Sequence, residues 1–167
     1  MRDEKWRSSE TTKLDGSSLL VFDLDHTLVH TVESSVHSKA GRSYAISSDM
    51  RTYVRPHVHE FFRTLHHRKI PYAVWTAGTR DYAEAVVSVL RRGGPFHPLF
   101  VWDRAQTTGP DWVKDLRRIP AYPQVLLLDD SRHHLKLKSN RDRIMIVPQF
   151  TVTTLGDTFF RTLKKQI

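Results

Sequence analysis

Short and long apolar patterns alternate along this chain. Short runs of apolar, β-prone residues followed by turn-forming residues predict buried strands, because they are too short for helices. Longer segments carry apolar residues at helical spacing, as Val58, Phe61, Phe62 and Leu65 do, and predict amphipathic helices. The predicted strands cover residues 19–24, 70–75, 99–102, 125–128 and 144–147, and the predicted helices cover residues 57–69, 80–91, 112–118 and 154–165.

Strands that alternate with helices predict an α/β fold, with a central parallel sheet flanked by helices and right-handed crossovers. Residues 30–53 are polar and rich in serine and histidine, so we expect a short, irregular insertion with at most a hairpin near 44–46 and 52–54. Residues 1–17 are polar and end in a turn-like sequence. They predict a flexible lead-in to a single domain over residues 18–167.

Reactive polar residues follow three of the predicted strands. Asp23 and Asp25 end the first, Thr76 follows the second, and Asp129 and Asp130 end a third. Ligands bind at the carboxyl ends of strands in open α/β sheets, so these residues predict one composite site. Two carboxylates at the end of a buried strand are costly unless a cation lies between them, which indicates catalysis or metal binding.

The composition limits the kinds of catalysis and metal binding that the chain can perform. The chain has 167 residues and no cysteine, which excludes disulfides, thiolate nucleophiles and cysteine-based zinc sites. The ten histidines are scattered or directly adjacent, as in His66-His67 and His133-His134, and we expect them on the surface and outside any metal site.

A formal net charge of +8 indicates attraction to polyanions such as nucleic acid, phosphorylated peptides or an anionic membrane surface, and an unspecialised basic surface explains the charge equally well. No apolar stretch approaches the ~20 residues of a membrane span. The N-terminal residues lack an apolar signal core and include acids, so we expect an intracellular protein, nuclear or cytoplasmic, without membrane attachment.

The spacing Asp23-x-Asp25-x-Thr27, followed by Thr76, Lys114 and Asp129-Asp130, resembles the four-motif signature of the haloacid-dehalogenase superfamily. Over residues 18–165 the chain resembles, more narrowly, the NLI-interacting-factor-like family, which includes the small phosphatases of the RNA polymerase II C-terminal domain (CTD). The segments that carry this resemblance are DLDHTLVH, YVRPHVHEFF, VWTAGTRDYAEAV, WVKDL and LLLDDS. The resemblance implies a Rossmann-like core.

The resemblance also assigns catalytic and metal-binding roles. Asp23 is expected to be the nucleophile that forms an aspartyl-phosphate, and Asp25 the general acid and then the general base. Mg²⁺, which prefers oxygen ligands, is expected to be held by the Asp23 carboxylate, the Asp25 backbone carbonyl and Asp130. Lys114 is expected to offset the negative charge of the site, and Asp129 to orient Lys114.

Further residues are expected to bind the substrate. Thr76 and the backbone N–H groups of Ala77 and Gly78 are expected to hold the phosphoryl oxygens. Thr27 is expected to cap the turn after the nucleophile and to reach the phosphate through its backbone. Arg80 and Arg104 are candidate contacts for a phosphopeptide or a second phosphate, although an ordinary surface arginine is the more common explanation for each.

The chain departs from the family pattern in two places. His26 stands where the small CTD phosphatases have glutamate or glutamine. Residues 30–53 are too polar to predict the apolar, proline-binding pocket that the family builds there. The chain also has no segment long enough for the large cap of other superfamily members, and an uncapped basic cleft favours a macromolecular substrate.

The leading hypothesis is a Mg²⁺-dependent phosphatase that acts on phosphoserine or phosphothreonine in a phosphoprotein, such as one like the polymerase C-terminal domain. A nucleic-acid 3′-phosphatase of the same superfamily is an alternative that the positive charge favours. A third alternative is a non-catalytic binding module with a phosphatase-like fold. The complete set of motif residues argues against this last alternative.

Overall fold

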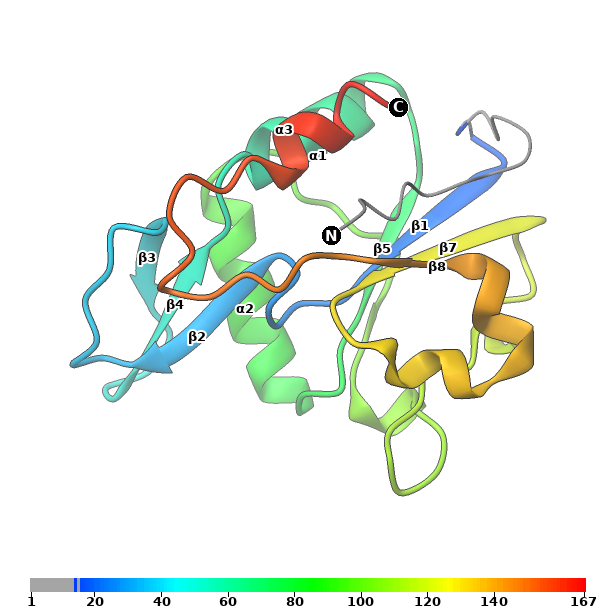
Figure 1. The fold of residues 1–167 in the computed structure, drawn as a ribbon, viewed down its shortest axis with the longest axis horizontal. Coiled ribbons are helices and arrows are strands. Elements are labelled where there is room, and N and C mark those ends of the chain that lie inside the picture. Colours follow the sequence, from blue (N-terminus) through cyan, green and yellow to red (C-terminus); the bar gives the residue numbers. More distant parts are fainter. Residues whose placement is uncertain (1–13, 15) are drawn as a thin grey trace, which may run out of the picture.

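The computed structural model describes residue 14 and residues 16–167 (Figure 1). The predicted lead-in over residues 1–17 therefore lies almost wholly outside the described residues. The architecture is a five-stranded parallel sheet in the order β6-β5-β1-β7-β8, as the alternation of strands and helices predicts. Its strands are β1 (Ser18–Phe22), β5 (Tyr72–Trp75), β6 (Val101–Trp102), β7 (Gln124–Asp129) and β8 (Ile144–Ile146).

The two faces of this sheet bury alternate residues of β1. Leu20 and Phe22 point to the face that is covered by α1 (Val58–His67), α2 (Arg80–Arg92) and α3 (Phe159–Leu163). Leu19 and Val21 point to the other face, which is covered by irregular segments and short 3₁₀ turns. These turns are η1 (Arg104–Gln106), η2 (Leu116–Arg118), η3 (Arg132–Lys136) and η4 (Lys138–Arg143).

The hydrophobic core fixes the end of β1, where the first motif, Asp23-x-Asp25-x-Thr27, begins. The Phe22 ring packs edge-to-face against Phe61 and Phe62 of α1, with ring centroids 5.9 and 5.0 Å apart. Phe22 is fully buried, and it directly precedes Asp23. The position of the first carboxylate is therefore set by close packing rather than by a mobile loop.

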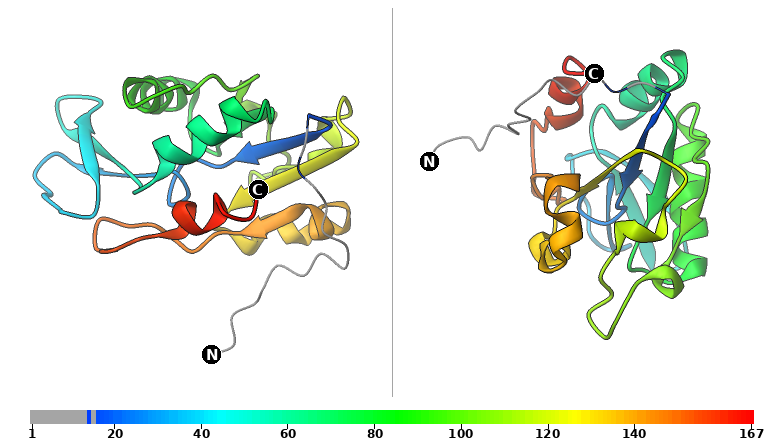
Figure 2. Two further views of the ribbon diagram at one scale, coloured as in Figure 1. Left: turned by 90° about the horizontal axis from the view of Figure 1, so that it is seen from above. Right: turned by 90° about the vertical axis from the view of Figure 1, so that its right-hand side faces the viewer.

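The insertion after the first motif is more ordered than the sequence predicts. It forms an antiparallel sheet in the order β2-β4-β3, from β2 (Val29–Glu33), β3 (Arg42–Ala45) and β4 (Met50–Val54). The expected hairpin is present as β3 and β4, but β2 was not predicted because its sequence VHTVE is mostly polar. This sheet projects beyond one end of the main sheet (Figures 1 and 2).

Two predicted helices are wrong in extent. Of residues 112–118 only Leu116–Arg118 forms a 3₁₀ turn, because Trp112 has a positive φ of 51° and Asp115 caps the turn that follows. Of residues 154–165 only Phe159–Leu163 is helical, because Gly156 has a φ of 68° and interrupts the helical backbone. In the described part of the chain, no helix combines the length and the apolar character that a membrane crossing requires.

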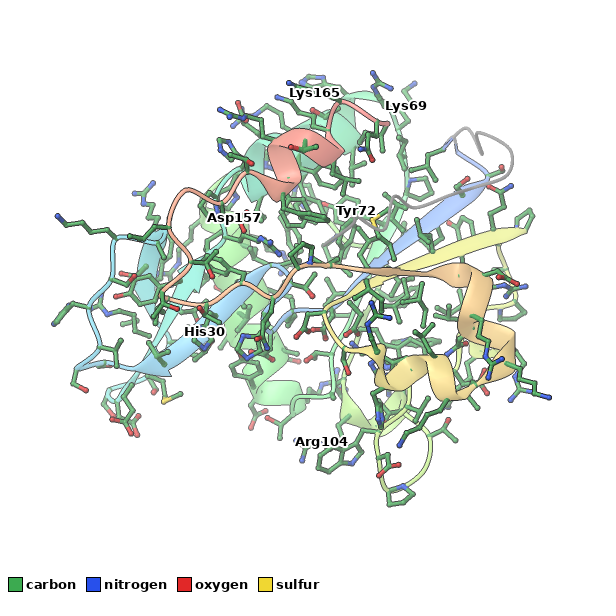
Figure 3. The ribbon with its side chains drawn as sticks, in the orientation of Figure 1. His30, Lys69, Tyr72, Arg104, Asp157 and Lys165 are labelled. Atoms are coloured by element: carbon green, nitrogen blue, oxygen red, sulfur yellow. The ribbon has the colours of Figure 1, made fainter. Side chains whose placement is uncertain are left out.

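A buried arginine joins the first motif to the segment before α3. The Arg55 guanidinium donates to both carboxylate oxygens of Asp157, from Nε at 3.1 Å and from Nη2 at 2.8 Å. Its Nη1 donates to the backbone oxygen of Thr27 at 3.1 Å. Figure 3 labels Asp157 beside the orange-red segment that leads into α3. One fully buried cation thus satisfies groups from two distant parts of the chain.

Candidate active site

The first motif folds around a single backbone oxygen. The Leu24 carbonyl accepts hydrogen bonds from the N–H groups of Thr27, Leu28 and Val29 at 3.3, 2.9 and 3.0 Å. His26 adopts the left-handed region with a φ of 60° to close this turn. As a result Asp23 is buried at the end of β1, whereas Asp25 is partly exposed in the turn.

Lys114 lies between two carboxylates from different strands. Its Nζ donates to Asp23 Oδ1 at 2.5 Å and to Asp129 Oδ2 at 2.6 Å. All three side chains are buried. Charge-assisted hydrogen bonds of this length inside a protein are strong, and they hold the ammonium and both carboxylates in one geometry. The position of Asp129 therefore agrees with the prediction that this residue orients Lys114.

Hydrogen bonds to His134 and Asn140 hold the backbone of Lys114 in place. The Lys114 N–H donates to His134 Nδ1 at 3.2 Å, and Asn140 Nδ2 donates to the Lys114 carbonyl at 2.8 Å. Because His134 Nδ1 accepts a hydrogen bond, the ring proton is on Nε2, which lies 3.1 Å from Asp129 Oδ2 and donates to it.

The expectation that all histidines are surface residues is wrong for His134. This side chain is only 4% exposed and belongs to the site. Sequence reasoning missed it because its neighbour His133 and the basic residues around it are typical of a solvated segment. Asn140 was missed for the same reason, although it is fully buried.

The two lysine-bound carboxylates have opposite pKa shifts. Burial raises the pKa of Asp23 well above its usual value, and the negative charges of Asp129 and Asp25 raise it further against the effect of Lys114. Burial also acts on Asp129, but the Lys114 charge and the His134 hydrogen bond outweigh it, so the pKa of Asp129 is lowered. The difference has a structural cause, since Asp129 accepts additional hydrogen bonds from His134 and the Ser131 N–H.

The turn after β5 is built for close backbone approach. The buried Thr76 accepts a hydrogen bond at Oγ1 from the Gly78 N–H, at 3.0 Å. A Cβ on Gly78 would lie 2.8 Å from Cδ1 of Tyr82 and 3.2 Å from Thr76 Oγ1, so only glycine fits. The next residue, Thr79, caps the thirteen-residue helix α2. An anion at this turn would face the positive end of the helix dipole.

Tyr82 is a site residue that the sequence did not reveal. Its hydroxyl donates to the Asp25 carboxylate and also lies 2.7 Å from Thr31 Oγ1, which in turn lies 2.7 Å from Thr52 Oγ1. Burial and the nearby Asp25 charge raise the pKa of Tyr82, so its hydroxyl remains a donor. The sequence showed only an aromatic residue on the apolar side of a helix, where packing is the ordinary explanation.

An open cleft with a volume of about 380 Å³ brings most of the predicted residues together. Arg104 lies at its rim, where its Nε donates to the Ala77 carbonyl at 2.8 Å. The rim also includes Trp112, whose ring lies under the Arg104 guanidinium. The predicted residues that line the cleft are Asp23, Asp25, Thr76, Ala77, Gly78, Arg104, Lys114, Asp129 and Asp130.

Two predicted substrate-binding residues lie outside the cleft lining. Thr27 is fully buried, and its N–H and carbonyl are used by Leu24 and Arg55. It therefore shapes the turn behind Asp23 rather than facing a ligand. Arg80 is exposed at the start of α2 and pairs with Glu84 at 3.1 Å. It lines a separate groove between α2 and the edge strand β6.

The residues present fit a divalent cation. One carboxylate oxygen from each of Asp23, Asp129 and Asp130 lies within 4.8 Å of the others. Burial and the Asp129 charge raise the pKa of Asp130, as they do for Asp23, so the Lys114 ammonium offsets the negative charge of the cluster only in part. Carboxylate oxygens are the donors that Mg²⁺ prefers. Because Asp129 is already occupied by Lys114 and His134, Asp23 and Asp130 are the members best placed to act as ligands.

Comparisons with known proteins support the sequence resemblance. A family model described as NLI interacting factor-like phosphatase matches residues 18–165. The CTD small phosphatase-like proteins of Homo sapiens and Mus musculus are each 30% identical over 136 residues, which cover 76% of this chain and 48% of theirs. A probable C-terminal domain small phosphatase of Dictyostelium discoideum is 31% identical over 111 residues, covering 62% of this chain and 35% of that protein. The chain thus spans about half or less of the length of these relatives.

Solved structures show the same fold. The structure of Fcp1, an essential RNA polymerase II CTD phosphatase, matches with a TM-score of 0.62 and 20% identity, over 93% of this chain and 48% of that one. Fission yeast Fcp1 bound to beryllium fluoride matches with a TM-score of 0.61 and 17% identity, over 93% of this chain and 50% of that one. The predicted α/β fold of the haloacid-dehalogenase type is confirmed.

Proposed function

Because this chain belongs to the NLI interacting factor-like phosphatase family of the haloacid-dehalogenase superfamily, we propose that it is a Mg²⁺-dependent phosphatase that hydrolyses phosphoserine or phosphothreonine in proteins. One observation carries the proposal. The buried Lys114 ammonium contacts Asp23 and Asp129 at the floor of a cleft that also holds Asp25 and Thr76. Such a group of charges is costly in a structural role and suits the transfer of a phosphoryl group.

The first step uses Asp23 as the nucleophile. One of its oxygens is held by Lys114, which leaves the other free to attack phosphorus. As the new O–P bond forms, the bond from phosphorus to the seryl oxygen breaks, and Asp25, which enters this step protonated, gives its proton to that oxygen. The products are the free hydroxyl of the substrate and an aspartyl-phosphate on Asp23.

The second step hydrolyses the aspartyl-phosphate. Asp25, now deprotonated, takes a proton from water as the water oxygen attacks phosphorus, and the Asp23 carboxylate leaves. The Tyr82 hydroxyl orients the Asp25 side chain in both steps. We expect the Thr76 hydroxyl and the Ala77 N–H to hold the phosphoryl oxygens beside the N-terminus of α2, because the Gly78 N–H is already donated to Thr76 Oγ1.

The metal requirement is part of the proposal. When bound by the Asp23 carboxylate, the Asp25 backbone carbonyl and Asp130, Mg²⁺ supplies positive charge that offsets the repulsion between these carboxylates and a phosphate dianion. Lys114 contributes the protein's own positive charge at the same place. Asp129, paired with Lys114 and His134, keeps this ammonium directed at Asp23.

The substrate class is inferred from the shape of the cleft and from the relatives. The catalytic residues line an open cleft, which gives a phosphorylated side chain on a protein access to Asp23. The relatives are described as CTD small phosphatases, so a segment like the polymerase C-terminal domain is the first substrate to test. Such a substrate places the protein inside the cell, in the nucleus or the cytoplasm.

The net charge of +8 favours one alternative, a nucleic-acid 3′-phosphatase of the same superfamily. The deciding experiment compares kcat/KM on phosphoserine peptides and on 3′-phosphorylated oligonucleotides, with Mg²⁺ and with EDTA. We expect turnover of the peptides, its loss in EDTA and recovery on adding Mg²⁺. Preferential turnover of the oligonucleotides would select the alternative, and no turnover of either would favour a non-catalytic binding module.

The covalent mechanism has its own test in Asp23→Asn. This variant is expected to lose turnover by at least about 10⁴-fold, because an amide is not a nucleophile under these conditions. The matched control is Asp81→Asn, which changes an exposed aspartate in the first turn of α2. Full activity in Asp23→Asn would rule out the aspartyl-phosphate.

A further inference from the structure

Trp112 is an exposed aromatic side chain at the rim of the catalytic cleft. Within the described residues three large apolar side chains are strongly exposed, Leu99, Trp112 and Leu155, with 57%, 44% and 70% of their surface accessible. Of these three, Trp112 alone lines the cleft that holds Asp23. Exposure of an indole costs hydrophobic free energy, so its place beside the site calls for an explanation.

Hydrogen bonds of the loop hold Trp112 in a backbone conformation that tryptophan rarely adopts. The loop closes through two hydrogen bonds between Thr108 and Val113, at 2.8 and 3.0 Å, and the Trp112 N–H donates to the Gly109 carbonyl at 3.3 Å. Within this loop Trp112 has a φ of 51°. The left-handed region is unfavourable for a bulky aromatic residue, and such strain gathers at functional sites.

Arg104 fixes the ring relative to the phosphate-binding turn. Its guanidinium carbon lies 4.2 Å from the centroid of the Trp112 ring, which covers one face of the indole. The same guanidinium donates from Nε to the Ala77 carbonyl, and the Arg104 N–H donates to the Gly78 carbonyl at 3.0 Å. Arg104 thus holds the indole at a set position beside the phosphate-binding turn, where 44% of the surface of Trp112 remains accessible. Figure 3 labels Arg104 at this side of the molecule.

The charges nearby select the chemistry of the group that this surface can bind. A cationic side chain on the open face would be repelled by the Arg104 charge on the other face. An acidic side chain would gain more from Arg104 itself than from the indole. A flat, uncharged ring buries apolar surface against the indole without either difficulty.

We propose that Trp112 is a specificity-determining residue, on which the proline or aromatic ring of a residue flanking the phosphoserine or phosphothreonine packs. This inference rests on the proposed function, because it requires a peptide in the cleft. The contact lies on the wall formed by the loop that follows β6. It is separate from the insertion sheet, which reaches the site through Tyr82 and Thr31.

The test measures kcat/KM for phosphoserine peptides that differ at one flanking position. Proline, phenylalanine, alanine or lysine is placed in turn at each of the two positions on either side of the phosphoserine. We expect proline or phenylalanine at one of these positions to raise kcat/KM about three- to tenfold over alanine, mainly through a lower KM. Lysine at that position is expected to give no gain.

Trp112→Gly removes the ring and should leave the fold intact, because glycine adopts a φ of 51° without strain. In this variant the ratio of kcat/KM between the ring-containing and the alanine peptide is expected to fall below about twofold. Trp112→Phe is expected to retain the preference for a ring. The matched control is Leu99→Gly, at the opposite end of β6 from the cleft, which should keep the wild-type preference.

The outcomes separate this inference from the function on which it rests. A ring preference that persists in Trp112→Gly would overturn the role of Trp112 while leaving the phosphatase intact. Equal kcat/KM for all peptides in the wild type would overturn it as well. If the wild type hydrolyses oligonucleotide 3′-phosphates and no peptide, the proposed protein substrate fails, and the inference fails with it.

Discussion

The Tyr82 hydroxyl donates a hydrogen bond to the Asp25 carboxylate, across 57 residues of sequence. Tyr82 lies in the first turns of α2, and Asp25 lies in the turn after β1. Because Tyr82 also contacts Thr31, the proposed acid–base residue is linked to the insertion sheet. A short chain of hydrogen bonds therefore connects the Asp25 carboxylate to strands β2 and β4.

Tyr82→Phe tests this link. Loss of a hydrogen bond to a charged group is worth about 1.5–3 kcal/mol, so we expect kcat/KM on a phosphoserine peptide to fall about tenfold or more. The loss should be smaller on p-nitrophenyl phosphate, whose leaving group needs little protonation. Tyr44→Phe, in β3, is the matched control and should be unaffected. Equal losses of kcat/KM on both substrates would contradict a role in proton donation by Asp25, since kcat/KM reports the first step and the second step is common to both substrates.

His134→Gln tests whether the buried imidazole positions Lys114 and Asp129. The change removes the acceptor for the Lys114 N–H and disturbs the hydrogen bond to Asp129. Residues that orient catalytic groups in this indirect way commonly contribute about 10–100-fold. We expect a loss of this size in kcat with little change in KM, measured on p-nitrophenyl phosphate. His67→Gln, on the exposed end of α1, is the control, and a change in KM alone would point to another role.

Mg²⁺ should stabilise the folded protein independently of turnover. At a concentration 100 times the Kd, binding to the folded state alone adds about 2.7 kcal/mol, which raises the Tm. Asp130→Asn is expected to abolish most of this increase, because Asp130 belongs to the carboxylate cluster. Asp142→Asn, an exposed aspartate of η4, should retain the increase. An undiminished Mg²⁺ effect in Asp130→Asn would remove this residue from the metal site.

The raised pKa of Asp23 predicts a stability cost in the metal-free protein. A folded-state pKa above the unfolded value means that stability is fully present below the unfolded pKa and is lost as pH rises through the folded pKa. Asp23→Asn carries no such cost, so its Tm at neutral pH should exceed that of the wild type in EDTA. The difference should shrink as the pH falls toward the unfolded pKa. A wild type that is the more stable protein at neutral pH would contradict the raised pKa.

Breaking the Arg55–Asp157 pair should destabilise the fold. Arg55→Met leaves a buried, uncompensated Asp157 carboxylate and an unpaired Thr27 carbonyl, a change that typically costs about 3–5 kcal/mol. Asp157→Asn in the same chain should recover part of this loss, since the buried negative charge is then gone. Urea denaturation of the two single variants and the double variant gives the coupling energy. Strictly additive losses would show that the pair does not act as a unit.

Much of the site could be predicted because it lies at strand ends. Asp23, Thr76 and Asp129 each follow a run of apolar residues, and parallel strands bring their carboxyl ends to one edge of the sheet. Lys114 could not be placed by pattern alone, since it follows no strand and is one of 26 basic residues. The motif resemblance identified it, and the structure shows how the chain brings it between Asp23 and Asp129.

The residues that sequence reasoning missed act through long-range contacts. Tyr82, His134 and Asn140 carry no local signal, because helix packing or a polar surface explains each of them. Strand β2 was missed because its pairing with β4 stabilises a segment whose own composition is polar. Trp112 adopts its positive φ because the pairing of Thr108 with Val113 imposes it, and no sequence pattern predicts that backbone.

The sequence by itself determined the order of strands and helices, the class of fold and the carboxylates at the strand ends, because hydrophobic periodicity and short motifs are local properties. Only the tertiary structure decided which histidine is buried, which tyrosine donates to Asp25, and which aromatic ring lies at the cleft. Those choices depend on burial and on hydrogen bonds between residues far apart in the chain, and such interactions exist only once the sheet has assembled.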